Sequence, residues 1–135
     1  MTIESEGYVN NFGKQLRFFR NQSEDPKTGK HLTQEFLASS LYEEMGIQYT
    51  GAAVSDWERG ESKINADDRL LLLGLVKILN RYGGIKSSSE ADQLLESGNY
   101  RALNQTEKVD IFSSEVKRVD SPLTIPIIAK SQSYI

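Results

Sequence analysis

The sequence predicts a globular all-α protein; two local patterns predict the helices and the composition predicts the globular class. Apolar residues recur at the three- and four-residue spacing that places side chains on one face of a helix. A threonine, serine or asparagine stands where such segments begin, and a glycine stands where most of them end. Hydrophobic residues make up 38% and charged residues 26% of the chain, as is usual for a soluble globular protein.

The first helix is predicted over residues 8–20, where four apolar side chains share one face. These are Tyr8, Phe12, Leu16 and Phe19. The following residues, 21–31, are rich in turn formers and predict a surface loop.

The second and third helices are predicted from their end signals. The second begins after Thr33, an N-cap, has Glu35 in its first turn, and ends at Gly46. The third begins after Thr50 and ends at Gly60, where the chain needs a residue that tolerates the left-handed conformation.

The fourth helix is predicted to begin after Asn65, with Asp67 and Asp68 in its first turn, and to end at Gly83 and Gly84. Residues 70–79 are apolar on nearly every side, which favours a central core helix. The alternative is that one side of this helix meets a partner.

Two more helices are predicted in the second half, because residues 87–90 (SSSE) and 104–107 (NQTE) both fit a capping box. The first of them turns Leu94 and Leu95 inward and stops at Gly98. The second places on one face Val109, Phe112 and Val116.

This pattern divides the chain into a domain at 1–85, a helical extension at 86–118 and an irregular tail or linker at 119–135. The tail contains two prolines and several β-branched residues without a helical period. Three interpretations stay open for it: a frayed end, a linker, or an extended segment that docks on a protein partner.

Composition and the absence of known motifs argue against several classes of function. The net charge of −3 provides no overall positive field for nucleic acid. The absence of cysteine excludes thiolate chemistry, and there is one histidine and no phosphate-binding glycine loop. We therefore expect no enzyme activity, no cofactor and no metal. The start lacks a secretory signal, and residues 70–79 are too short to cross a membrane, so a cytoplasmic protein with no membrane contact is expected.

Three ordered fragments identify a family resemblance. They are FGKQLR at 12–17, LTQEFLA at 32–38 and VSDWERG at 54–60. Together they resemble the helix-turn-helix domain of the Cro/phage-repressor (XRE-type) family over residues 8–82. This resemblance implies a lambda-repressor-like bundle, in which Arg20 pairs with Glu58 as a structural ion pair.

The resemblance also implies which residues would touch DNA: the start of the second helix and the exposed face of the third. These are Gln34, Thr50, Gly51, Ala52, Ala53, Ser55 and Asp56. Residues that could add contacts are Gln48 and Tyr49 from an insertion, and a basic rim of Lys14, Arg17, Lys27, Lys30, His31, Arg59 and Lys63.

Two departures from the family pattern bear on this function. The third helix supplies none of the side chains that usually read guanine or adenine, and Asp56 would repel phosphate. The connection between the second and third helices is also about six residues longer than the family's usual turn, which changes the geometry of the motif.

A second resemblance covers residues 90–112. They resemble the helical extension that follows such modules at the N-terminus of large bacterial signalling ATPases, with the pattern A-x-x-L-L-x-x-x-x-Y-x-x-L. The residues that match are Ala91, Leu94, Leu95, Tyr100 and Leu103. The chain is then either a fragment of a longer protein or a stand-alone relative.

Two functions follow as hypotheses. The first is a DNA-binding transcriptional regulator, with double-stranded DNA as its partner and a homodimer to read paired half-sites. The ordered motif and Gln34 favour it. The alternative is a protein-interaction adaptor of the same fold with weak or no DNA binding, which Asp56, the insertion and the tail at 119–135 favour.

Overall fold

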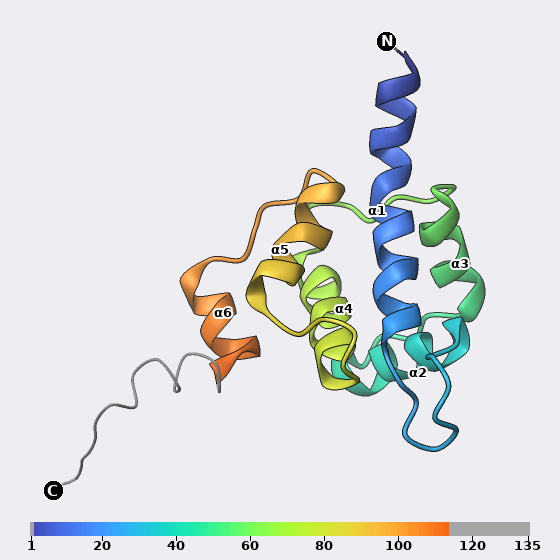
Figure 1. Cartoon of the computed structure of the whole chain (residues 1–135), viewed down its shortest axis with the longest axis vertical. Coiled ribbons are helices and arrows are strands. Elements are labelled where there is room, and N and C mark those ends of the chain that lie inside the picture. The colour runs from blue at the N-terminus through green and yellow to red at the C-terminus, as the bar shows by residue number, and fades with distance from the viewer. Residues whose placement is uncertain (1, 114–135) are drawn as a thin grey trace, which may run out of the picture. The chain divides into compact units, whose positions relative to one another are not determined.

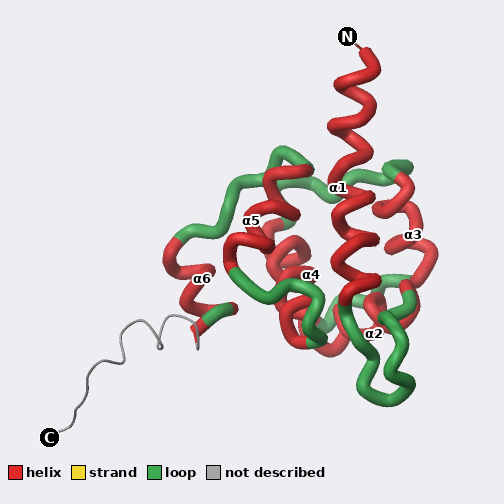
Figure 2. Tube along the Cα trace, in the orientation of Figure 1, coloured by secondary structure: helices red, strands yellow, loops and turns green. Residues whose placement is uncertain are grey.

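The computed structural model describes residues 2–113, with side chains from residue 11 onward (Figure 1). This part of the chain is all-α, as predicted, and contains six helices and no strand (Figure 2). They are α1 (Thr2–Gln22), α2 (Gln34–Met45), α3 (Gly51–Arg59), α4 (Arg69–Arg81), α5 (Ser88–Ser97) and α6 (Gln105–Ile111).

The described residues form two compact units, one ending at Leu103 and one beginning at Asn104. In the first unit α1 packs against α3 and α5, and α2 packs against α3 and α4. Figure 1 shows α1 between α3 on one side and α5 on the other. Helix α5, which was expected in the extension, is therefore part of the first unit. The predicted tail at 119–135 lies outside the described residues.

Helix α1 contributes the apolar face that its spacing predicts. Phe12, Leu16 and Phe19 are buried, while the side chain of Tyr8 lies outside the described residues. The loop after α1 is a surface loop, as predicted, and it is closed by an antiparallel bridge between Glu24 and His31.

The predicted ends of α2 and α3 are confirmed. The hydroxyl oxygen of Thr33 accepts a hydrogen bond from the backbone N–H of Phe36 at 3.0 Å, and that of Thr50 accepts one from Ala53 at 3.1 Å. Gly46 and Gly60 both have a φ of 76°, the left-handed conformation that glycine adopts without a steric penalty.

The predicted start of α4 is wrong, because Asp68 rather than Asn65 is the N-cap. The side chain of Asn65 accepts a hydrogen bond from the backbone N–H of Asp67 at 2.8 Å, so it stabilises a separate turn before the helix. The helix is otherwise central, as predicted, with most of its apolar side chains buried. One exception is Leu70, which is 72% exposed.

The two predicted capping boxes differ in outcome. The box at 104–107 is complete. At 87–90 only half of it forms, because Ser87 caps α5 but the Glu90 carboxylate accepts from the backbone N–H of Lys86. Leu94 and Leu95 are buried, and Gly98 ends α5 as predicted, although the left-handed residue is Asn99, with a φ of 66°.

Helix α6 keeps only part of its expected apolar face. Val109 is 41% exposed and Phe112 is buried, while Val116 lies outside the described residues. None of the helices in residues 2–113 is both long enough and apolar enough to span a membrane.

Candidate functional site

The centre of the candidate site is the buried carboxylate of Glu58, near the end of α3. Arg20 of α1 donates from Nε to Glu58 Oε2 at 2.6 Å and from Nη2 to Oε1 at 2.9 Å. The third donor of Arg20, Nη1, reaches the backbone oxygen of Leu32 at 2.8 Å. The Glu58 side chain is fully buried, so this bidentate pair is the structural ion pair that the resemblance implied.

Two further side chains donate to the same carboxylate. Gln34, at the start of α2, donates from Nε2 to Glu58 Oε1 at 2.9 Å, and Arg17 donates from Nε at 3.3 Å. Burial alone would raise the pKa of Glu58, but the hydrogen bonds from Arg20, Gln34 and Arg17 and the charge of Arg20 outweigh it and lower the pKa. Glu58 therefore stays ionised and ties α1, α2 and α3 together.

A glycine allows α1 and α3 to cross closely beside this network. A Cβ atom added to Gly13 would lie 2.7 Å from the backbone oxygen of Trp57 and closer still to that of Glu58. A side chain at this position would therefore push the two helices apart. Gly13 belongs to one of the fragments that carried the family resemblance, and the helix crossing is its physical reason.

The predicted contact residues of α3 lie on its outward face. Val54, Trp57 and Glu58 point inward and are buried. The residues that remain exposed or partly exposed are Thr50, Gly51, Ala52, Ala53, Ser55, Asp56 and Arg59. This face is consequently made of small side chains, with its charged groups at the C-terminal end.

Arg59, a predicted basic contact, forms hydrogen bonds and ion pairs with residues close to it in the sequence. It donates to Asp56 Oδ1 at 2.6 Å, to Glu61 Oε2 at 2.6 Å and to the Ser55 hydroxyl at 3.2 Å. Two carboxylates thus compensate its charge. This part of the predicted basic rim provides no net positive charge for a phosphate group.

A carboxylate also lies at the other end of α3. The side chain of Glu35 approaches the backbone of Gly51 so closely that a Cβ atom added there would lie 2.7 Å from Glu35 Oε2. The positive end of the α3 dipole is therefore already next to a negative charge. An incoming phosphate would have to displace this side chain or share the position with it.

The insertion residues have different environments. Gln48 is exposed, while Tyr49 is half-buried and meets the Trp57 ring edge-on, with ring centroids 5.5 Å apart. Burial, and secondarily the charge of Asp68, raises the pKa of Tyr49. Tyr49 therefore helps to pack the insertion onto α3, and of the two residues Gln48 is the one open to a partner.

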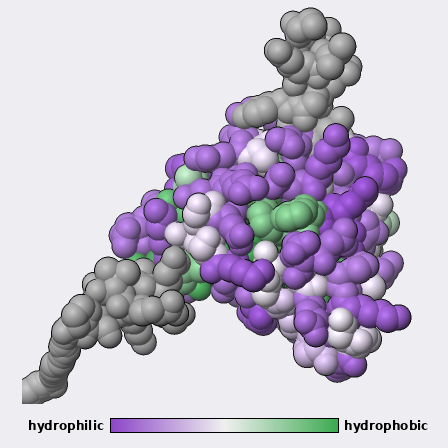
Figure 3. All heavy atoms as spheres, viewed as in Figure 1, coloured by the Kyte–Doolittle hydropathy of each residue, from purple (hydrophilic) through white to green (hydrophobic). Residues whose placement is uncertain are grey.

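Of the remaining residues of the predicted rim, the lysines and His31 are exposed, and Arg17 is held by Glu58. The lysines make no side-chain ion pair with another described residue; they are Lys14, Lys27, Lys30 and Lys63. Figure 3 shows a largely hydrophilic face that is interrupted by a small hydrophobic patch. The first unit also exposes several large apolar side chains, namely Phe18, Tyr42, Ile47 and Leu70.

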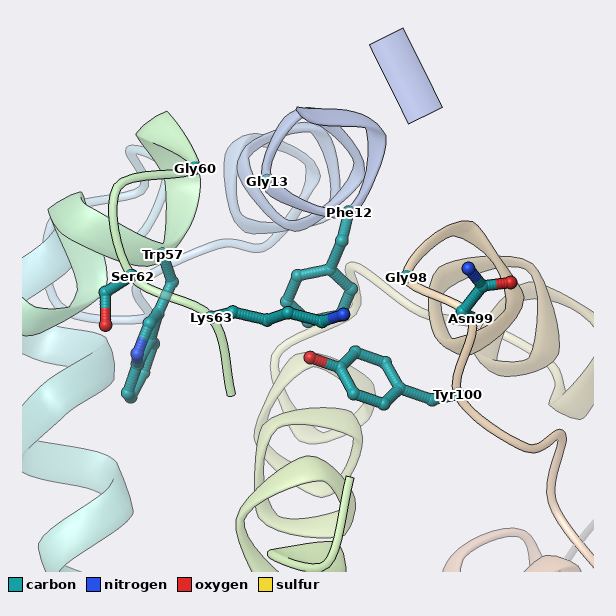
Figure 4. Close-up of a pocket in the computed structure, with 9 residues that line it drawn as sticks. All are labelled: Phe12, Gly13, Trp57, Gly60, Ser62, Lys63, Gly98, Asn99 and Tyr100. Carbon is teal, nitrogen blue, oxygen red and sulfur yellow. The ribbon is translucent and has the colours of Figure 1, made fainter. Parts of the chain in front are cut away.

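Sequence reasoning missed a cavity beside α3, shown in Figure 4. Phe12 of α1, Trp57 of α3 and Tyr100 after α5 line it, and Lys63 extends toward the rings of Phe12 and Tyr100. The hydroxyl of Tyr100 donates to the backbone oxygen of Ile64 at 2.5 Å, and burial raises its pKa in spite of this bond. No local signal could reveal the cavity, because its walls come from segments far apart in the sequence.

Within residues 2–113, no group of three or more histidine, aspartate or glutamate side chains is arranged to hold a metal ion. Comparisons of the chain with models of protein families, with curated proteins and with solved structures found no match.

Proposed function

We propose that the first unit is a lambda-repressor-like helix-turn-helix module that binds double-stranded DNA. The observation that carries this proposal is the Glu58 network, in which Arg20 of α1 and Gln34 of α2 meet a carboxylate of α3. The network holds α3 against α1 and α2 with its small side chains outward. Because the exposed face of α3 carries mostly small side chains, the backbone of this helix can come close to the floor of a major groove.

The proposed complex relies on the DNA backbone more than on base edges. Gln34 lies at the start of α2 and donates one amide N–H to Glu58, so its second N–H can donate to a phosphate, while Lys14 and Lys63 are cations open to phosphate. Ala52 offers only apolar contact with a thymine methyl group. Weak discrimination among sequences is therefore expected. Binding as a homodimer remains a prediction from the family resemblance.

A second function, a protein-interaction adaptor, is favoured by one observation. Carboxylates stand at both ends of the outward face of α3: Glu35 at its start, and Asp56 with Glu61 at its end. These groups repel phosphate and would attract a basic segment of a protein partner. The two proposals therefore differ in the charge of the partner that binds this face: DNA is negative, and the protein segment would be positive.

Binding to a mixed-sequence DNA duplex over a series of salt concentrations tests the first proposal. We expect binding at low salt that weakens steeply as salt increases, because phosphate contacts release counterions. The absence of binding at low salt would overturn the proposal and leave the adaptor as the better one.

A charge variant on α3 then locates the interface. Ala52→Glu places a carboxylate at the second residue of α3, where the helix dipole tolerates it and the side chain is exposed. The matched control is Ser89→Glu, which does the same at the second residue of α5. Weaker DNA binding is expected for the α3 variant alone. Equal effects of the two variants would place the DNA elsewhere.

A further inference from the structure

The polar side chains on the outward face of α3 are bound to their own neighbours. The Thr50 hydroxyl oxygen accepts a hydrogen bond from the backbone N–H of Ala53 at 3.1 Å. The Ser55 hydroxyl oxygen accepts from Arg59 Nε at 3.2 Å, and Arg59 Nη2 donates to Asp56 Oδ1 at 2.6 Å. Arg59 is the one side chain of α3 that could read guanine through paired hydrogen bonds, and its donors are already engaged.

Apolar groups remain at the start of this face. Ala52 is exposed and Ala53 is half-buried, and Gly51 before them has no side chain. The N-terminal residues of a recognition helix are the ones that contact base edges in the major groove. In a complex of the proposed kind, the first turn of α3 therefore meets the bases with methyl groups instead of hydrogen-bonding side chains.

The carboxylate beside this turn disfavours guanine. Glu35 Oε2 lies so close to the start of α3 that a Cβ atom added to Gly51 would be 2.7 Å from it. Guanine presents two acceptors, N7 and O6, in the major groove, whereas thymine presents one acceptor and a methyl group. A negative charge repels the edge of guanine more strongly, so the surroundings of Ala52 favour a base that carries a methyl group.

We propose that the α3 face selects duplex DNA by the C5 methyl groups in its major groove, which thymine and 5-methylcytosine carry. This inference rests on the proposed DNA binding and names the groups that the bound helix recognises. The side chain of Ala52 would remove such a methyl group from water. Burial of one methyl group changes affinity by about fourfold, which agrees with the weak discrimination expected of this face.

Two pairs of short duplexes that differ only in these methyl groups test the proposal. The first pair has either thymine or uracil opposite every adenine, and the second has either 5-methylcytosine or cytosine opposite every guanine. Anisotropy titrations with the full 135-residue chain at low, constant salt compare the two members of each pair. The methylated member of both pairs should bind more tightly by about fourfold for each methyl group that is buried.

The Ala52→Gly variant assigns this preference to α3, because it removes the exposed Cβ atom. The preference for the methylated duplex should fall by about fourfold. Both affinities are measured on the same variant, so any loss of folded chain cancels in their ratio. The matched control is Ala66→Gly, which changes another exposed alanine of the first unit and should keep the preference of the natural chain.

The outcomes separate this proposal from the one on which it rests. Equal binding of methylated and unmethylated duplexes would overturn the methyl selection and leave DNA binding standing. A preference in only one pair would point to the shape of that duplex and overturn it as well, as would an unchanged preference in Ala52→Gly. The absence of binding to any duplex at low salt would overturn both proposals together.

Discussion

Arg20 and Glu58 form a buried, bidentate ion pair, with Arg20 Nε 2.6 Å from Glu58 Oε2 and Nη2 2.9 Å from Oε1. The pair joins the C-terminal part of α1 to the C-terminal part of α3. Both side chains are almost completely enclosed, so neither can exchange its partner for water. The arrangement of the first three helices depends on this one contact more than on any exposed ion pair.

Removing the arginine should therefore be costly. Arg20→Met leaves the Glu58 carboxylate buried with fewer donors, and the free energy of unfolding should fall by about 3–5 kcal/mol. Urea unfolding followed by circular dichroism measures it. Arg59→Met is the matched control, because Arg59 is exposed in its pairs with Asp56 and Glu61, and its loss should cost less than about 1 kcal/mol. Similar losses in the two variants would contradict the assigned role of Arg20.

The ionisation of Glu58 should make the free energy of unfolding depend on pH. Its pKa in the folded chain lies below the ordinary value of 4.5, so the folded state favours the ionised form. The resulting stability is fully present above the unfolded pKa and is lost as the pH falls from there through the folded pKa. Urea unfolding at several pH values should show this loss.

The Glu58→Gln variant isolates the contribution of this carboxylate to the pH dependence. It should be less stable than the natural chain at neutral pH, and its stability should decline less as the pH falls below about 4.5, because the titrating group is gone. Glu43→Gln, which changes an exposed carboxylate on α2, is the control and should keep the steeper decline. Parallel pH curves for Glu58→Gln and the natural chain would exclude Glu58 as the source.

Gly13 should tolerate no side chain. Alanine favours helix over glycine by about 1 kcal/mol at an open position. Gly13→Ala, however, should lower the free energy of unfolding by about 1–3 kcal/mol, because the new Cβ would meet backbone atoms of Trp57 and Glu58. Thermal and urea unfolding measure the effect. Ser39→Ala, at an exposed position of α2, is the control and should be neutral or stabilising. A stabilised Gly13→Ala variant would contradict the close helix crossing.

Local signals predicted the helix ends well and failed where two local interactions compete. Thr33 and Thr50 cap their helices because each has a free backbone N–H three residues ahead. Asn65 is an equally good cap by residue type, but its side chain binds the N–H of Asp67 in a turn. Asp68 then caps α4, and nothing in the residue types alone decides between the two.

Sequence reasoning anticipated the small side chains of α3 and the repulsive charge of Asp56, but not the partners of the polar and basic residues around them. The resemblance implied a DNA contact for Gln34, and Arg59 was expected in a basic rim, but Gln34 donates to Glu58 and Arg59 is held by acidic neighbours. The Arg59 pairs lie within three residues in sequence and could have been anticipated from the acidic spacing. The approach of Glu35 to Gly51 could not have been anticipated, because the two residues belong to different helices and meet only in the folded chain.

Glu35 should control how strongly the α3 face binds DNA. Its carboxylate lies against the start of α3. There it would repel a phosphate, and it already occupies the positive end of the helix dipole, where a phosphate would otherwise be stabilised. Glu35→Gln removes the charge and keeps the shape, so affinity for a mixed-sequence duplex at low salt should rise about three- to tenfold. Fluorescence anisotropy of a labelled duplex measures the change.

The control for this variant is Glu43→Gln, which removes the same charge from an exposed position elsewhere on α2. Both variants change the net charge by one unit, so any difference between them reports the place of the charge and not its total. An increase for Glu35→Gln alone would put the duplex at the start of α3. Equal increases would point to a nonspecific effect of net charge, and no increase in either, with Ala52→Glu still weakening binding, would place Glu35 outside the contact surface.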